Sequence, residues 1–197
     1  MNRHKRLTVL FAGASGVLGR ATLPHLEAHD VVGLTRSPEK LELLRDLGAE
    51  AVLCDVYDHE RLLRVALRVR PQIVVNFLTD LGAGSAEANN RVRREGGRNI
   101  RDAAEAADAA RLVAESVAFA LTGEAARALE QLEQWTREFR GEALVLRFGR
   151  LWGPGTAYET PPEPPTIHVH EAGAKAARLI ADAAPGTYVV TAAHAYG

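Results

Sequence analysis

Short apolar runs alternate with longer amphipathic stretches along most of this chain. The apolar runs predict buried strands, and they lie at 7–12, 31–35, 51–54, 72–78, 111–116, 143–147 and 186–191. The stretches between them have the apolar spacing of helices, at 17–28, 37–47, 58–69, 89–107, 122–140 and 172–183. Pro24 falls inside the first stretch, so we expect that helix to bend or to end early.

Strands that alternate with helices pair in parallel through right-handed crossovers. The pattern therefore predicts an α/β fold with a doubly wound parallel sheet, a Rossmann fold with three αβα layers. The length suits one domain over residues 1–197. Prolines interrupt the pattern at 156–166, where they favour an extended, unpaired backbone, so we expect a surface loop there.

Composition and charge narrow the range of partners. The chain is 47% hydrophobic and 25% charged with a net charge of −1, which gives no broad attraction to nucleic acid or to acidic membranes. No apolar run reaches the ~20 residues that span a bilayer. Cys54 is the one cysteine, so no intrachain disulfide can form, and we expect a cytoplasmic location.

Three glycines with the spacing G-x-x-G-x-x-G follow the first predicted strand and open the first predicted helix. Gly13 permits a tight turn, Gly16 lets the backbone approach a pyrophosphate, and Gly19 lets the helix pack closely. The N–H groups at the start of the helix favour an anion. The predicted phosphate-binding segment comprises Gly13, Ala14, Ser15, Gly16, Val17, Leu18 and Gly19.

The end of the second strand indicates which dinucleotide is bound. An NAD site usually has Asp or Glu there to accept from the ribose 2′-hydroxyl, whereas this chain has Arg36. A guanidinium binds a 2′-phosphate bidentately, and Ser37 and Lys40 lie close by in the sequence. We therefore predict NADP, with NAD as the alternative. The other interpretation of Arg36 is a solvated surface residue.

Two further strand ends carry candidate nucleotide contacts, because ligands of such sheets lie at the carboxyl ends of the strands. Asp55, followed by Val56, is placed to accept from an adenine amino group. The segment Asn76, Phe77 and Leu78 is expected beside the adenosine ribose. Asp55 has an equally good alternative role, as the cap of the helix that begins near 58.

Several segments in this order resemble the extended and atypical short-chain dehydrogenase/reductase superfamily, in its NAD-dependent epimerase/dehydratase branch. They are 13–19, 54–55, 93–100, 112–118, 147–155 and 167–169, and they cover most of the chain. The resemblance implies a dinucleotide-binding Rossmann domain that transfers hydride at the nicotinamide to a small molecule. It does not specify that substrate.

The resemblance also implies roles for single positions. Ser116 matches a serine or threonine that contacts the substrate, and Leu151 and Trp152 match the loop over the nicotinamide. His168 matches a core histidine, and His170 stands where an acidic residue is usual. The two histidines could share a zinc ion, but no third ligand is evident, so we predict no metal.

The sequence departs from the family at the catalytic pair Tyr-x-x-x-Lys. Arg127 can be aligned with the lysine, which leaves Gly123 in place of the tyrosine, and arginine cannot supply the same proton chemistry. Tyr158, in the proline-rich loop, is the tyrosine that could reach the site from elsewhere. The candidate catalytic residues are thus Ser116, Arg127 and Tyr158. The substrate-binding insertion of the relatives shrinks to 156–166, so we expect a much reduced substrate region.

Two functions fit these observations. The matching nicotinamide loop and Ser116 favour an NADP(H)-preferring oxidoreductase or epimerase-like enzyme. The missing catalytic pair favours a protein that binds or senses NADP(H) without turnover. The resemblance further implies a homodimer through helices 89–107 and 122–140, which carry Ile100, Leu129 and Leu132. Alternatively, these side chains simply cover the sheet.

Overall fold

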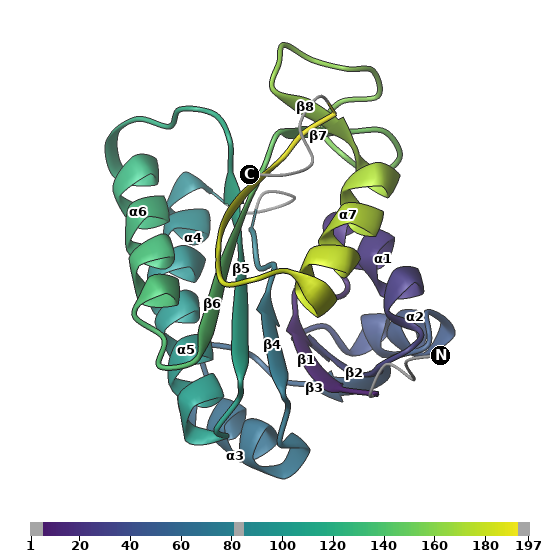
Figure 1. Ribbon diagram of the computed structural model, residues 1–197, viewed down its shortest axis with the longest axis vertical. Helices are drawn as coiled ribbons and strands as arrows, with labels where there is room; N and C mark the ends of the chain where they lie inside the picture. The colour runs from purple at the N-terminus through teal and green to yellow at the C-terminus, as the bar shows by residue number, and fades with distance from the viewer. Residues whose placement is uncertain (1–5, 81–84, 193–197) are drawn as a thin grey trace.

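A seven-stranded parallel sheet forms the centre of the molecule (Figure 1). The computed structural model describes residues 6–80 and 85–192. The strand order is β3-β2-β1-β4-β5-β6-β9, and every neighbouring pair is parallel. The strands are β1 Thr8–Ala12, β2 Asp30–Thr35, β3 Glu50–Leu53, β4 Ile73–Asn76, β5 Arg111–Val117, β6 Glu142–Phe148 and β9 Gly186–Val190. Each strand lies within a residue or two of a predicted apolar run.

Helices cover both faces of this sheet, so the predicted doubly wound, three-layer fold is confirmed. One face carries α1 Val17–Thr22, α2 Leu41–Asp46 and α7 Val169–Asp182. The other carries α3 His59–Val69, α4 Ala86–Arg91, α5 Gly97–Ala106 and α6 Gly123–Arg137 (Figure 1). Successive β1 side chains alternate between the two apolar cores: Phe11 packs with Ile180 of α7, and Leu10 packs with Ile100 of α5.

Two predicted helices are interrupted. The first ends as an α-helix at Thr22 and continues as a 3₁₀ turn over Leu23–Leu26, which confirms the effect of Pro24. The long helix predicted over 89–107 consists of α4 and α5 joined by a π-helical turn over Val92–Gly96. Such turns insert an extra residue into the helix and occur often at functional sites.

A second, two-stranded parallel sheet was not predicted. It pairs β7 Arg150–Trp152 with β8 Thr166–His168 and lies beside the start of α7 (Figure 1). Three residues are too few to show a strand period in the sequence. The proline-rich segment joins β7 to β8 and has no helix or strand of its own between 153 and 165, as expected of a loop.

The apolar residues that suggested a homodimer make contacts within this chain or line a groove on it. Ile100 is fully buried in the core beneath α3 and α5, and Leu132 packs against Gly97 of α5. Leu129 lines a groove beside β5. These side chains therefore give no independent reason for a dimer. Among the described residues, no helix is long and apolar enough to cross a membrane.

Candidate functional site

The glycine-rich loop between β1 and α1 is packed so tightly that larger residues do not fit at two positions. Gly13 has φ +90°, and a Cβ there would lie 2.3 Å from the carbonyl oxygen of Phe77 at the end of β4. A Cβ on Gly19 would lie 2.2 Å from the Gly13 carbonyl oxygen. The Gly16 N–H donates to that same oxygen at 2.9 Å. The loop thus brings bare backbone to the start of α1 at the point where β1 and β4 diverge.

The fold gathers the predicted cofactor contacts at one edge of the sheet. Parallel strands end at the same edge, so their C-terminal loops become neighbours. Arg36 and Ser37 follow β2, Asp55 and Val56 follow β3, and Phe77 and Leu78 follow Asn76, the last residue of β4. Leu151 and Trp152 lie in β7, and the ring of Trp152 meets that of His168 edge to face at 4.6 Å between centroids. Their contact with a nucleotide stays a prediction.

Arg36 has a partner that the sequence did not reveal. Its Nη2 lies 3.3 Å from an Asp80 carboxylate oxygen, just beyond the end of β4. The backbone N–H of Asp80 donates to the Asn89 side chain at 3.0 Å, which fixes the position of this carboxylate. More than half of the Arg36 side chain remains exposed, so the guanidinium has free donors for a further anion.

The turn after β3 resolves the two roles considered for Asp55. Helix α3 is capped by Asp58, whose carboxylate accepts from the Arg61 N–H at 3.0 Å, so the capping role expected of Asp55 is wrong. The Asp55 carboxylate instead accepts from the N–H of Tyr57 at 3.0 Å. The neighbouring Val56 carbonyl accepts from the buried Asn99 side chain at 2.9 Å, which ties this turn to α5.

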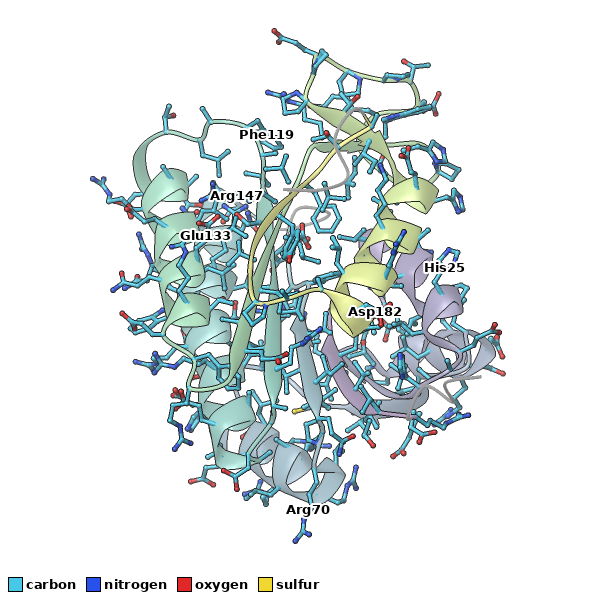
Figure 2. The ribbon with its side chains drawn as sticks, in the orientation of Figure 1. His25, Arg70, Phe119, Glu133, Arg147 and Asp182 are labelled. Atoms are coloured by element: carbon cyan, nitrogen blue, oxygen red, sulfur yellow. The ribbon has the colours of Figure 1, made fainter. Side chains whose placement is uncertain are left out.

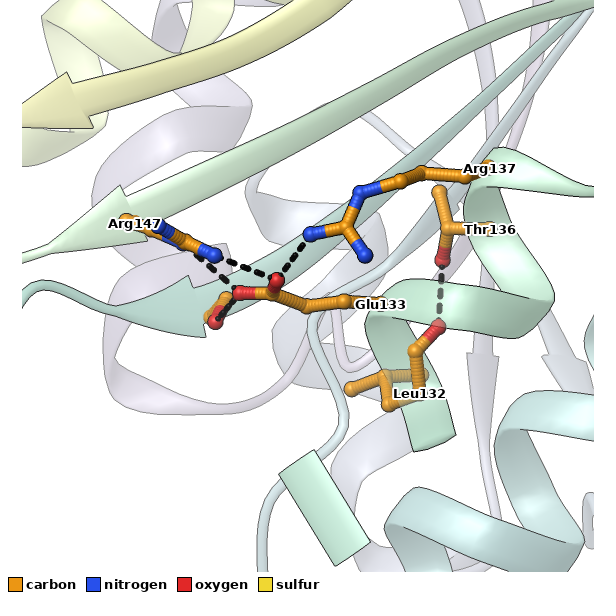
Figure 3. Close-up of polar contacts among 6 residues, drawn as sticks. Leu132, Glu133, Thr136, Arg137 and Arg147 are labelled. Atoms are coloured by element: carbon orange, nitrogen blue, oxygen red, sulfur yellow. Dashed lines mark hydrogen bonds and ion pairs between the residues drawn. The ribbon is translucent and has the colours of Figure 1, made fainter. Parts of the chain in front are cut away.

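Ser116 belongs to a buried polar cluster. It is 1% exposed, and its hydroxyl donates to Glu133 of α6 at 2.6 Å. Arg147 of β6 donates twice to the same carboxylate, at 2.8 and 2.6 Å, and Arg137 also contacts it (Figure 3). The Ser116 hydroxyl proton is thus directed at Glu133, and a contact between Ser116 and the substrate stays a prediction.

The cluster stabilises the ionised form of the Glu133 carboxyl group. Burial alone would raise the pKa of its carboxyl group, but hydrogen bonds from Arg147 and Ser116 outweigh that effect and lower the pKa. Glu133 therefore holds β5, β6 and α6 together as a carboxylate.

The other two catalytic candidates lie away from this cluster. Arg127 is on the outer side of α6 with 68% of its side chain exposed, and it pairs with Glu124. This outward position does not favour a catalytic role for Arg127, which stays a prediction. Tyr158 is exposed in the loop after β7. In the described part of the chain, no recorded contact joins it to Ser116 or Arg127.

A groove of about 440 Å³ opens where β5 ends beside α6. Its walls combine apolar side chains with charged ones, and Figure 2 shows three of its residues, Phe119, Glu133 and Arg147, in one region. The lining comprises Val117, Ala118, Phe119, Leu121, Ala126, Leu129, Glu130, Glu133, Arg137, Arg147 and Val189. Neither a tyrosine nor a lysine occurs among these described residues, so the groove lacks the proton-transferring pair of the relatives.

Sequence reasoning also missed Glu115, which precedes Ser116 on β5. Burial raises the pKa of its carboxyl group to about 7, and the nearby charge of Arg93 opposes that rise. Arg93 lies in the π-helical turn and is 6% exposed. One signal was available in the sequence: a charged residue inside an otherwise apolar strand.

Comparison with known proteins settles the family. A family model described as NAD(P)H-binding matches residues 13–147. The chain belongs to this NAD(P)H-binding family. The matched range begins at the first glycine of the loop and ends at Arg147, so it contains the glycine loop and the strands from β2 to β6 of the central sheet, the last of them up to Arg147.

The relatives comprise a reductase and several epimerase-type enzymes. The 3-diazoavenalumate denitrifying reductase of a Streptomyces species is 35% identical over 77% of this chain. The alignment spans 59% of that relative, so this chain corresponds to less than two thirds of its length.

Solved structures show the same fold. The enzyme WbmG of Bordetella bronchiseptica, crystallised with NAD, has a TM-score of 0.78 and 17% identity, covering 97% of this chain and 74% of WbmG. A putative NAD-dependent epimerase/dehydratase from Bacillus halodurans has a TM-score of 0.76 and 17% identity, covering 92% and 91% of the two chains. The predicted NAD(P)-binding Rossmann fold is confirmed.

Proposed function

We propose that this chain is an NAD(P)H-dependent reductase of a small electrophilic molecule. The observation that carries the proposal is the fit of the glycine loop to a dinucleotide. The protein's own backbone excludes side chains at Gly13 and Gly19, so the loop keeps the tight turn that sets N–H groups at the head of α1, where a pyrophosphate would bind. Asp55 and Asn76 would flank the adenosine, and Trp152 would lie toward the nicotinamide. When bound, the reduced cofactor supplies a hydride.

The reductase among the relatives suggests the acceptor. Its name specifies reduction of a diazo compound with loss of nitrogen, and we extend that class of acceptor to this chain. A neutral diazo compound needs one hydride and one proton for each dinitrogen released. A preformed diazonium cation needs the hydride alone. Turnover is thus compatible with the absence of the Tyr-x-x-x-Lys pair from this chain.

The experiment is a label transfer. The protein is incubated with a diazo ester and NADPH deuterated at the transferable position of the nicotinamide. We expect dinitrogen release and one cofactor-derived deuterium in the product. A protein that binds NADPH but transfers no deuterium to any diazo or carbonyl acceptor would instead be the binding or sensing protein, and the reductase proposal would fail.

We also propose that NADPH is preferred over NADH, on the basis of Arg36. A phosphate–guanidinium contact is charge-assisted, so Arg36→Asp should weaken NADPH binding by about 10- to 150-fold and leave NADH binding nearly unchanged. Asp80 competes with the phosphate for this guanidinium at 3.3 Å, so Asp80→Asn should strengthen NADPH binding. Equal affinities for the two cofactors in the unsubstituted protein would refute the preference.

Two further expectations stay proposals. The single buried thiol supports a cytoplasmic location. A homodimer through 89–107 and 122–140 is tested by sedimentation, in which a species of 21.3 kDa alone at micromolar concentration would refute it.

A further inference from the structure

Glu115 lies at the level of the glycine loop. Ala12, the last residue of β1, is in register with Asn76 of β4, and Asn76 is in register with Ala114 of β5. The next residues of the three segments are Gly13, Phe77 and Glu115. Gly13 presses against the Phe77 carbonyl, so Glu115 follows directly across β4 from the loop that would hold the cofactor. Strand β5 continues past this row to Val117.

Strand alternation separates Glu115 from the cluster around Glu133. Ser116 faces α6, where it donates to Glu133. Glu115 therefore faces the opposite side, together with Val113, which belongs to the core beneath α1 and α7. That side of the sheet carries the start of α1 and the glycine loop. The residue keeps partial solvent contact. Within residues 6–80 and 85–192, no hydrogen bond to its carboxyl group is recorded.

One buried cation acts on this carboxyl group. Arg93 lies in the π-helical turn between α4 and α5, on the other face of the sheet, and acts on the carboxyl group through its charge. Burial lowers the pKa of Arg93, while the charge of Glu115 raises it. Protein atoms close around the Glu115 carboxyl and raise its pKa to about 7. Near neutral pH the group thus exists in both protonation states, which is the condition for efficient general acid catalysis. No other charged group of the described residues is recorded as acting on it.

We propose that Glu115 is the proton donor of the reductase, in the role that the tyrosine has in the epimerases. With a neutral diazo compound, the O–H bond of Glu115 breaks and its proton forms a C–H bond at the diazo carbon. The hydride forms the second C–H bond, and dinitrogen leaves with the electron pair of the C–N bond. With a carbonyl, the proton goes to oxygen and the hydride to carbon. Glu115 is left as a carboxylate, a form that the charge of Arg93 favours, and regains a proton from water.

This inference rests on the proposed reductase function, and a choice of acceptors separates the two. A diazo ester needs the proton, whereas a preformed arenediazonium cation needs only the hydride. We expect Glu115→Gln to reduce kcat for the ester by about 10²–10⁴-fold and to change kcat for the cation by less than about threefold. Glu115→Asp should restore part of the ester activity. Glu60→Gln, on the exposed outer side of α3, is the matched control and should leave both reactions unchanged.

Every outcome decides the assignment. Unchanged ester reduction by Glu115→Gln overturns the proton-donor role and leaves the reductase standing. An equal loss on both acceptors, or weaker NADPH binding, also overturns it, because Glu115 would then position the site. If the unsubstituted protein binds NADPH but reduces neither acceptor, the reductase function fails and this role fails with it. Circular dichroism verifies that each variant is folded.

Discussion

The raised pKa of Glu115 has a consequence for stability that needs no substrate. The unfolded chain ionises this group near pH 4.5, whereas the folded protein retains the proton to about pH 7. Between these values the folded state binds more protons than the unfolded state, so the free energy of unfolding falls as the pH rises. A pKa shift of this size corresponds to a contribution of about 3 kcal/mol to the free energy of unfolding. This contribution is fully present below pH 4.5 and is lost above pH 7.

Glu115→Gln removes this titration and keeps the shape of the side chain. We therefore compare the free energy of unfolding of Glu115→Gln with that of the unsubstituted protein at each pH. This difference should shift in favour of the variant by about 2–3 kcal/mol from about pH 5 to about pH 8. Urea denaturation at the two pH values measures both proteins, and the difference between them cancels every other titrating group. Glu60→Gln should show no such change with pH. A difference that is the same at both pH values would show that the Glu115 carboxyl titrates normally, and the argument from burial would be wrong.

Three further predictions follow from single contacts. Gly19→Ala should lower NADPH affinity at least about tenfold and the free energy of unfolding by about 1–3 kcal/mol, because the added Cβ has no space. The control is Gly48→Ala, at positive φ but in open space, which should leave NADPH affinity unchanged in the same titration. Glu133→Ala should lower the free energy of unfolding by about 2–3 kcal/mol, because Ser116 and Arg147 lose their acceptor. Exposed Glu130→Ala should lower it by less than about 0.5 kcal/mol. Equal losses in urea denaturation would contradict the role of the cluster. Burial raises the pKa of Cys54 to about 11, so iodoacetamide should alkylate it far more slowly in the folded protein than in urea, and equal rates would show that the thiol is accessible.

Much of the fold follows from local pattern. Each apolar run became a strand of the central sheet because a strand buried on both faces needs apolar residues at nearly every position. The glycine spacing located the loop, since the steric demands at Gly13 and Gly19 allow few other residues. The π-helical turn and the small β7–β8 sheet were not predictable, because tertiary contacts and not composition stabilise elements of a few residues.

In the candidate functional site, the tertiary structure decided more than the sequence did. Ser116 was the obvious polar candidate on β5, yet its hydroxyl serves Glu133, and the neighbouring Glu115 occupies the side of the glycine loop. Alternation along a strand says that these two residues face opposite ways, but it cannot say which of them faces the side of the glycine loop. That choice depends on the register of β5 against β4, where a shift by one residue would exchange their positions.

By itself, the sequence determined the doubly wound sheet, the glycine loop and the edge at which a dinucleotide would bind, because hydrophobic period and glycine sterics act over a few neighbouring residues. Only the tertiary structure decided which charges meet. Asp80 pairs with Arg36 from another strand end, Glu133 binds Arg147 from a different element, and the charge of Arg93 in the π-helical turn acts on Glu115 of β5. Electrostatic effects of this kind depend on distance and burial in space, and the order of residues along the chain carries neither.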